Sequence, residues 1–423
     1  MTLIKRFRMN AWKAALATAS AVVFGTAGLS QAQAPSATNV TPAAPVTSAP
    51  QGDMLPMMGP AANGGTDDPS RFWLNSEYLL WWVRGQNLPP LVTTSPAGTP
   101  QALAGLLGQP TTTVLYGNSR VNDDSRSGFR FTVGSWLDCD HHWAIGAEYF
   151  MLENEATHFH ADSTGTPILA RPFFDVLAGA PARELIAFPG VASGNVNVGT
   201  SMQLLGAGVF LEGNLCCGCG YRVDGIVGYR YLQLKEGLGI DENVTSTAVG
   251  FNVPPVGTTF NVLDQFNTEN EFNGVDLGLL SHWERGRLSL NLLTKVALGD
   301  TEREVNINGR TIIAVPGVPP QTFSGGLLAL GTNIGNHRSN TFSVVPELRI
   351  DVGYQITEHL RAFIGYDFLY WTDVARPGDQ VNLNINTNNI PPVIPGGPAQ
   401  PAFQLHESSF WAQGINFGLG IRF

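Results

Sequence analysis

The last thirteen residues of the chain alternate between two kinds of side chain. Apolar residues stand at odd positions and small or polar residues at even ones: Trp411, Ile415, Phe417, Leu419, Ile421 and Phe423 against Gly414, Asn416, Gly418, Gly420 and Arg422. Neighbouring side chains of a β-strand point to opposite faces, whereas a helix would scatter these residues around its axis. The pattern therefore predicts a strand with one apolar and one polar face, ending in the aromatic residue Phe423.

Nine earlier segments share this two-faced pattern: Phe72–Val83, Gly128–Leu137, Trp143–Leu152, Met202–Gly213, Tyr221–Leu234, Phe272–Leu280, Leu288–Leu298, Phe342–Tyr354 and Leu360–Trp371. Most are close to the roughly 9–11 residues with which a tilted β-strand crosses a bilayer. Aromatic residues near the segment ends predict an interfacial girdle, with core packing as the alternative for some of them: Trp81, Trp82, Trp143, Tyr229, Tyr231, Tyr370, Trp371 and Trp411. The alternation is what a barrel strand requires between lipid and a polar interior.

Composition agrees with a membrane protein that crosses with strands. Charged residues make up 14% of the 423 residues, against about 25% in soluble domains. Past residue 30 there is no apolar run of the roughly 18 residues that a transmembrane helix needs. The apolar surface is therefore spread in alternation rather than gathered in blocks.

The connections between segments also alternate. Four are short, and the other five are long and rich in Pro, Gly, Thr and Asn. The short ones are Asp138–His142, Asn214–Gly220, Ser281–Gly286 and Gln355–His359. Outer-membrane barrels have short periplasmic turns and long extracellular loops. We therefore expect an all-β fold, a closed antiparallel transmembrane β-barrel of about 10 strands with both termini periplasmic.

Twelve strands are the alternative, because the long connections contain two further strand-like stretches. These are Val191–Thr200 and Val381–Asn386. We favour the interpretation that both prolong barrel strands above the membrane.

The N-terminus resembles an export signal. Lys5, Arg6, Arg8 and Lys13 precede an apolar stretch and an A-x-A site at Ala32–Ala34. The stretch is short and rich in Ala, Thr and Ser, which disfavours a membrane anchor. We expect a signal peptide over residues 1–34, a disordered Pro/Ala-rich periplasmic linker over 35–70 and the barrel over 71–423. Cleavage takes the formal net charge from −10 to −14, which disfavours nucleic acid as a partner.

Several stretches resemble one family. They are Phe72–Val83, Leu88–Ser95, Leu107–Gly117, Gly128–Phe131 and Leu169–Phe174. Together they are similar to the planctomycete outer-membrane family called putative beta-barrel porin 7, from about residue 71 to the C-terminus. The resemblance implies an outer-membrane barrel, but no substrate and no functional residue. A strand ending in Phe also resembles the signal that such barrels present to their assembly machinery, so outer-membrane lipid and that machinery are the expected partners.

The polar faces of the segments carry charges of both signs, seven positive and eight negative: Glu77, Arg130, Glu148, Glu212, Arg222, Asp224, Arg230, Asp276, Lys295, Glu347, Arg349, Asp351, Arg361, Asp367 and Arg422. Ten strands lie near the size at which side chains fill a barrel. Balanced charges can pair in the interior, whereas an ion-selective pore favours a ring of one sign. We expect a narrow or closed lumen lined by these residues, with the specific role in the surface loops. A small-solute channel gated by inward-folding loops is the alternative.

Evidence for an enzyme is weak. His158 and His160 would share one face of an extended strand, as a catalytic or metal pair might require, but the sequence offers no third partner. Exposed loop histidines are the favoured interpretation. Four other histidines fall in the short turns: His141, His142, His282 and His359. We find no cofactor motif, and GLLALG at Gly326–Gly331 has the composition of a loop rather than of a nucleotide site.

All four cysteines fall in short turns: Cys139 in the first, and Cys216, Cys217 and Cys219 in the second. Disulfides are expected in the oxidising periplasm, one between the two turns and another within Cys216–Cys219. A metal site of four sulfur ligands and thiols linked to another protein are the alternatives.

Overall fold

The computed structural model describes residues 71–249 and 254–423. The predicted signal peptide and linker lie outside the described residues. The described part is mainly β-structure, with two short 3₁₀ turns, η1 (Pro377–Gln380) and η2 (Thr387–Asn389). Within residues 71–249 and 254–423, no helix is long and apolar enough to cross a bilayer.

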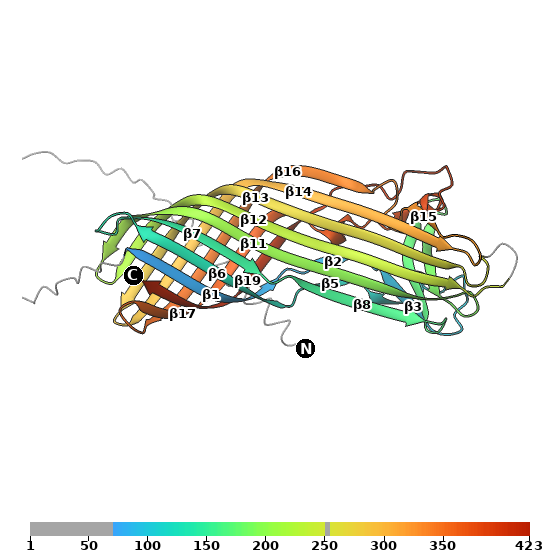
Figure 1. Ribbon diagram of the computed structural model, residues 1–423, viewed down its shortest axis with the longest axis horizontal. Helices are drawn as coiled ribbons and strands as arrows, with labels where there is room; N and C mark the ends of the chain where they lie inside the picture. The colour runs from blue at the N-terminus through green and yellow to red at the C-terminus, as the bar shows by residue number, and fades with distance from the viewer. Residues whose placement is uncertain (1–70, 250–253) are drawn as a thin grey trace, which may run out of the picture. The chain divides into compact units, whose positions relative to one another are not determined.

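Ten antiparallel strands form a closed ring, in which the last strand pairs with the first (Figure 1). In chain order they are β1 (Phe72–Val83), β6 (Ser125–Trp136), β7 (Trp143–Leu152), β11 (Ala192–Gly218), β12 (Tyr221–Ser246), β13 (Thr259–Arg285), β14 (Leu288–Ala314), β16 (Gly335–Gln355), β17 (Leu360–Ala375) and β19 (Glu407–Arg422). Two more strands, β8 (Glu155–Ser163) and β15 (Gln321–Ser324), pair with β11 and β14 beyond the ends of β7 and β16. They lengthen the wall without widening the ring. The predicted ten-stranded barrel is confirmed, and the alternative of a twelve-stranded barrel is wrong.

The four short turns are confirmed at one end of the ring, where they join β6 to β7, β11 to β12, β13 to β14 and β16 to β17. Both ends of the ring sequence lie at this same end, since the amide of Phe72 donates to the carbonyl of Phe423 at 2.9 Å. Two long connections are shorter than expected. For example, β12 continues to Ser246 and β13 begins at Thr259.

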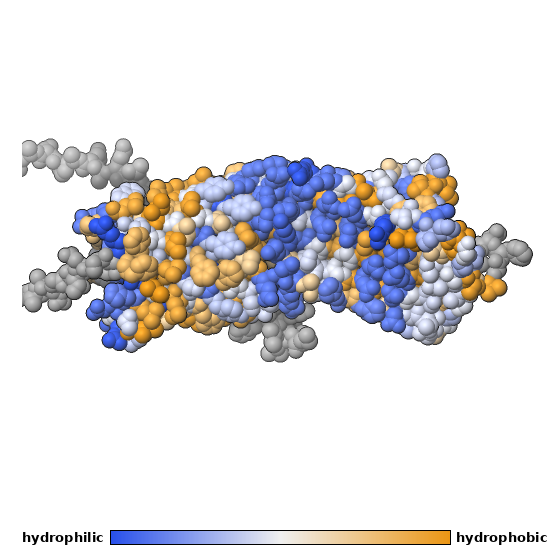
Figure 2. Space-filling model, in the orientation of Figure 1, coloured by the Kyte–Doolittle hydropathy of each residue, from blue (hydrophilic) through white to orange (hydrophobic). Residues whose placement is uncertain are grey.

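A band of exposed apolar side chains surrounds the ring next to the short turns (Figure 2). All ten strands contribute to it: Phe72, Tyr78, Phe131, Val133, Ile145, Tyr149, Val209, Leu211, Val227, Tyr229, Leu277, Leu279, Leu288, Leu290, Ile350, Val352, Ile364, Tyr366, Phe417 and Leu419. Soluble proteins rarely expose so large a contiguous apolar surface. The band is what a lipid-facing barrel wall requires.

Strands β11 to β14 run far beyond this band. They contain 27, 26, 27 and 27 residues, against the roughly 9–11 needed to cross a bilayer. We call the part beyond the band the extension: residues 192–203 of β11, 233–246 of β12, 259–271 of β13 and 300–314 of β14, with β8 and β15.

Along each long strand the alternation keeps its phase, but the two faces exchange character. On β12, Val227 points outward in the band and Arg230 points inward, whereas Leu238 points inward in the extension and Asp241 outward. Outside lipid the outer face meets water, so the apolar residues must pack on the inside. Figure 2 shows the hydrophilic belt that follows the apolar band.

Segments of the long connections fill the inside of the extension. A small sheet contains β3 (Val92–Ser95), β4 (Thr113–Tyr116), β9 (Ile168–Asp175) and β10 (Ala180–Ala187), and a separate pair contains β2 (Gln86–Leu88) and β5 (Ser119–Val121). Loop residues such as Leu91, Phe173 and Leu328 form one core with inward residues of the extension. The interior of the extension is therefore packed like that of a soluble domain.

The two strand-like stretches have different places. Residues 192–200 do prolong β11, as predicted. The prediction that Val381–Asn386 prolongs a barrel strand is wrong. Within it, the short strand β18 (Asn384–Ile385) pairs in parallel with β9, so this stretch belongs to the inner packing of the extension.

Candidate functional site

Ten of the fifteen predicted interior charges lie in one layer across the barrel. The positive members are Arg130, Arg230, Lys295 and Arg349, and the negative ones are Glu77, Glu148, Asp276, Glu347, Asp351 and Asp367. The amide of Asn416 joins them by donating to Asp367 at 2.9 Å. Their side chains are buried, and together they come from every strand of the ring except β11. We call this set the charged layer.

Arg130 joins carboxylates of two different strands in the charged layer. Its Nη2 lies 2.5 Å from Oε2 of Glu77 on β1 and 2.9 Å from Oδ2 of Asp367 on β17. Its side chain is 1% exposed. A buried charge is tolerated only when it is paired and hydrogen-bonded, and Arg130 meets both conditions.

The other three cations share the remaining carboxylates. Nη2 of Arg349 donates to Glu148 at 2.8 Å, and Nη2 of Arg230 lies 2.8 Å from Glu347. Nζ of Lys295 lies 3.3 Å from Asp276. The cations are thus bound to carboxylates of neighbouring or opposite strands, so the layer offers permeating ions no continuous ring of one charge sign.

An apolar layer lies directly beyond the charged one. Its aromatic members are Trp81, Phe150, Phe272, Trp371 and Phe410. Phe150 fits because Gly206 faces it, and a Cβ at that glycine would lie 2.0 Å from the Phe150 ring. The two layers are tied together, since Nε1 of Trp81 donates to Asp367 at 3.3 Å.

This arrangement corrects part of the predicted aromatic girdle. Trp81 and Trp371 are buried in the apolar layer and do not face the lipid boundary. Their place follows from the phase of β1 and β17, whose outward positions in the band are Tyr78 and Tyr366.

Two buried arginines hold loop segments inside the extension. Arg376, just after β17, donates from Nε to Glu236 of β12 at 2.8 Å and from Nη1 to the carbonyl of Gly85 at 2.9 Å. Arg171 of β9 lies 2.6 Å from Asp264 and 3.2 Å from Glu242. Each arginine therefore fixes a loop to the inner face of the barrel wall.

Asp264 also binds the backbone of the stretch GLLALG at Gly326–Gly331. Its Oδ1 accepts from the backbone amides of Leu327, Leu328 and Ala329 at 3.0, 2.9 and 2.8 Å. The stretch is thus a loop, as its composition predicts, and it folds into the extension around a carboxylate.

The surroundings of Glu242, which binds Arg171 together with Asp264, disfavour the charged form of its carboxyl group. Burial raises the pKa of the Glu242 carboxyl well above its usual range, and the neighbouring charge of Glu184 adds to the rise, whereas Arg171 opposes it.

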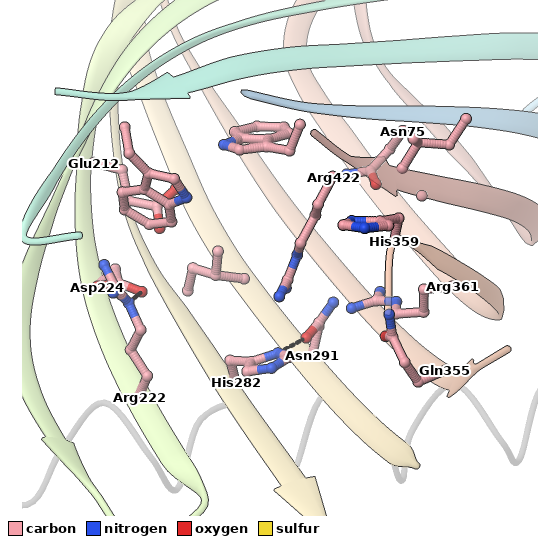
Figure 3. A pocket seen from close by; sticks show the side chains of 15 residues that line it. Asn75, Glu212, Arg222, Asp224, His282, Asn291, Gln355, His359, Arg361 and Arg422 are labelled. Atoms are coloured by element: carbon pink, nitrogen blue, oxygen red, sulfur yellow. Dashed lines mark hydrogen bonds and ion pairs between the residues drawn. The ribbon is translucent and has the colours of Figure 1, made fainter. Parts of the chain in front are cut away.

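The other five predicted interior residues lie at the end with the short turns. Glu212, Arg222, Asp224, Arg361 and Arg422 line a hollow of about 170 Å³ with Trp73, Trp136, His282, Asn291 and His359 (Figure 3). We call this hollow the mouth. Arg422 is exposed there and lies outside the charged layer.

The histidines divide into two groups. His158 and His160 on β8 both point outward from the extension, and Nδ1 of His160 lies 2.6 Å from Oδ1 of Asn197. His282 differs from the prediction, whereas His359 lies in its predicted turn. His282 belongs to β13 rather than to a turn, and both line the mouth.

The cysteines are all exposed and unbridged in the described structure. Cys216 and Cys217 lie at the end of β11 rather than in a turn, which corrects the prediction. The end of β11 lies beside the first turn, since the amide of Asn214 donates to the carbonyl of His142 at 2.8 Å. Beside Cys139, ligand atoms of Asp138, Asp140 and His142 lie within 4.8 Å of one another. The two carboxylates and the imidazole are a ligand set for a metal ion that the sequence analysis did not predict, because it considered His158, His160 and the cysteines and not the carboxylates of this turn.

Comparison with known proteins assigns the chain. A family model described as Putative beta barrel porin-7 matches residues 73–423. The chain belongs to this family. As a member of the porin-7 family with a closed ring of ten strands, it is an outer-membrane β-barrel protein.

Three solved structures match the chain at low sequence identity. The outer membrane protease OmpT of Escherichia coli is 7% identical, with 84% of this chain and 98% of that chain covered at a TM-score of 0.38. A Pseudomonas aeruginosa FadL homologue is 8% identical, with coverages of 84% and 90% and a TM-score of 0.25. The P. putida toluene transporter TodX is 9% identical, with 84% and 91% covered and a TM-score of 0.22. No curated protein matches the chain in sequence.

Sequence reasoning missed the buried ion pairs of the extension, such as those of Arg171 and Arg376. They lie beyond the segments that were interpreted as strands. The continued period-two alternation of residues 235–246, with Leu238 and Ile240 on one face, is the signal that would have revealed the longer strand.

Proposed function

We propose that this porin-7 protein is a non-conducting barrel that anchors a rigid extracellular platform in the outer membrane. The observation that carries the proposal is the filled interior. The charged layer and the apolar layer occupy the membrane-spanning part in succession, and a packed core occupies the extension.

Planar-bilayer recording of the purified, refolded protein tests this function. We expect no stable single-channel steps, because the interior is occupied by paired charges and close-packed rings. Large, reproducible steps from the wild-type protein would overturn the proposal.

A gated small-solute channel is the second candidate. It is supported by the fact that loop segments, rather than barrel strands alone, fill the extension, with Arg376 and Glu236 as a latch. In a gated channel, Arg376→Gln would loosen the loop and produce conductance that the wild type lacks. The surface variant Arg338→Gln would stay silent. Silence of both variants would favour the closed barrel.

The remaining assignments extend this proposal. Export by a signal peptide over residues 1–34, insertion by the barrel assembly machinery and planctomycete origin rest on the sequence pattern and the family resemblance. A role other than catalysis is supported by the outward, exposed setting of His158 and His160.

The disulfides between the periplasmic turns stay a prediction. Non-reducing electrophoresis of the wild type and Cys139→Ser distinguishes the pairings. A bond between the two turns would be lost in the variant, whereas a bond within Cys216–Cys219 would survive.

A further inference from the structure

We propose that the mouth binds a small oxyanion, a carboxylate or a phosphate group, from the periplasmic side. The mouth lies on the turn side of the charged layer, so the proposal does not depend on whether the lumen conducts. Its volume of about 170 Å³ admits several water molecules or a small anion.

One wall of the mouth is internally neutralised. Nε of Arg222 donates to both oxygens of Asp224 at 2.8 and 2.7 Å, and its guanidinium lies 4.5 Å from the ring centroid of Trp136. Asn214 also donates to Asp224 at 3.0 Å. Glu212 lies on the same side (Figure 3). The Asp224 carboxylate is therefore already paired with Arg222 within this wall.

The opposite wall carries two arginines without a carboxylate partner. Among the described residues, neither Arg361 nor Arg422 has a carboxylate oxygen within 4.0 Å, and Nε of Arg361 is buried without a partner. Figure 3 shows Arg361 on the far side of the hollow from Asp224, and Arg422 reaching toward the middle of the hollow. Glu284, at the rim, is instead engaged by Nε2 of His282 at 2.6 Å.

The positive charge of Arg361 also orients the side-chain amide of Asn291. A guanidinium can only donate, so the Asn291 amide is satisfied on both sides when it is turned with its oxygen toward Arg361, and in that orientation the oxygen lies 2.8 Å from Nη2. The amide nitrogen of Asn291 then donates to Nδ1 of His282. Arg361 is thus held in place by a neutral acceptor rather than by a carboxylate.

This arrangement favours an oxyanion over other ligands. The planar donors of a guanidinium match the oxygens of carboxylate and phosphate, and two arginines on one wall reinforce each other. The formal charge of the lining is three arginines against two carboxylates, so a bound anion meets a net positive site. The apolar rings of Trp73 and Trp136 complete the lining.

Equilibrium dialysis of the refolded full chain at constant ionic strength tests the site, with labelled inorganic phosphate and labelled acetate as separate probes. We expect saturable binding of one anion per chain for at least one probe. Arg361→Gln and Arg422→Gln should each weaken it about tenfold. Phosphate without acetate binding would assign the phosphate class, and the reverse result the carboxylate class.

Arg287→Gln is the matched control, because Arg287 is exposed at the same rim but does not line the mouth. It should bind like the wild type, and Arg422→Lys should keep part of the affinity. Heat-dependent mobility in electrophoresis confirms that each variant is folded. Absence of saturable binding to the wild type, or unchanged binding in the double variant Arg361→Gln/Arg422→Gln, would overturn the proposal.

Discussion

At the scale of single residues, the contribution of an ion pair to the stability of this protein depends on how deeply the pair is buried. Arg130 and Arg338 both pair with glutamate, at 2.5 and 2.9 Å, yet their side chains are 1% and 61% exposed. Water would solvate an unpaired Glu304 beside Arg338. It cannot reach Glu77 and Asp367, which would remain buried without their cation.

We therefore expect Arg130→Gln to lower the free energy of unfolding by about 3–5 kcal/mol. Arg338→Gln should change it by about 1 kcal/mol or less. Urea unfolding in lipid vesicles, followed by tryptophan fluorescence, measures both. Equal shifts in the two variants would contradict the assigned role of the charged layer.

Glu242 predicts a pH dependence of the extension. The raised pKa of this carboxyl means that the folded state holds its proton more tightly than the unfolded chain does. Its contribution to stability is full below the unfolded pKa and is lost as the pH rises through the raised folded value. Hydrogen exchange of residues 238–246, corrected for intrinsic rates, should therefore show less protection at pH 9 than at pH 5.

The variant Glu242→Gln should flatten this dependence, because its amide does not ionise. Glu269→Gln, on the outward face of the neighbouring strand, should keep the wild-type slope. An unchanged slope in Glu242→Gln would assign the pH dependence to another group.

At the scale of elements, the outer face of each long strand is in contact with lipid along one part and with water along the other. β13 faces lipid around Leu277 and water around Gln265, although both residues lie on its outer face. A strand can change its environment without a break, because the period of two is the same in both.

This change of environment predicts that a lysine substitution destabilises β13 at one outward position and is tolerated at another. Leu277→Lys should destabilise the folded barrel by about 2–4 kcal/mol, as a charge does at the lipid face. Gln265→Lys should be nearly neutral, because that position meets water. Folding titrations into vesicles compare the two, and a similar cost at both positions would show that the band ends elsewhere.

At the scale of the whole molecule, the ring fixes which parts share a side of the membrane. The termini of the ring, the short turns, the cysteines and the mouth lie at one end, and the extension lies at the other (Figure 1). With the short turns in the periplasm, the extension projects from the cell surface.

Impermeant maleimide labelling of intact cells tests this orientation. Asn243→Cys, in a background with all four native cysteines changed to Ser, should react in intact cells. Cys217 kept alone should react only after the outer membrane is permeabilised. The reverse pattern would invert the topology.

The ring of ten strands could be predicted from the sequence. Local alternation specifies which residues face lipid, and segment lengths and turn chemistry specify ten strands, because each depends on near neighbours in the chain. It also placed Glu77, Arg130 and Asp367 on inward faces.

The tertiary structure alone decided how that interior is used. Pairing Arg130 with Asp367 joins residues 237 positions apart. The separation of the charged layer from the mouth depends on the height of each side chain along the barrel axis. Apart from residues 192–200 of β11, the extension was missed for a physical reason. Its outer face is polar and its inner face apolar, the reverse of a lipid-facing strand, and only the loops folded inside the barrel explain why.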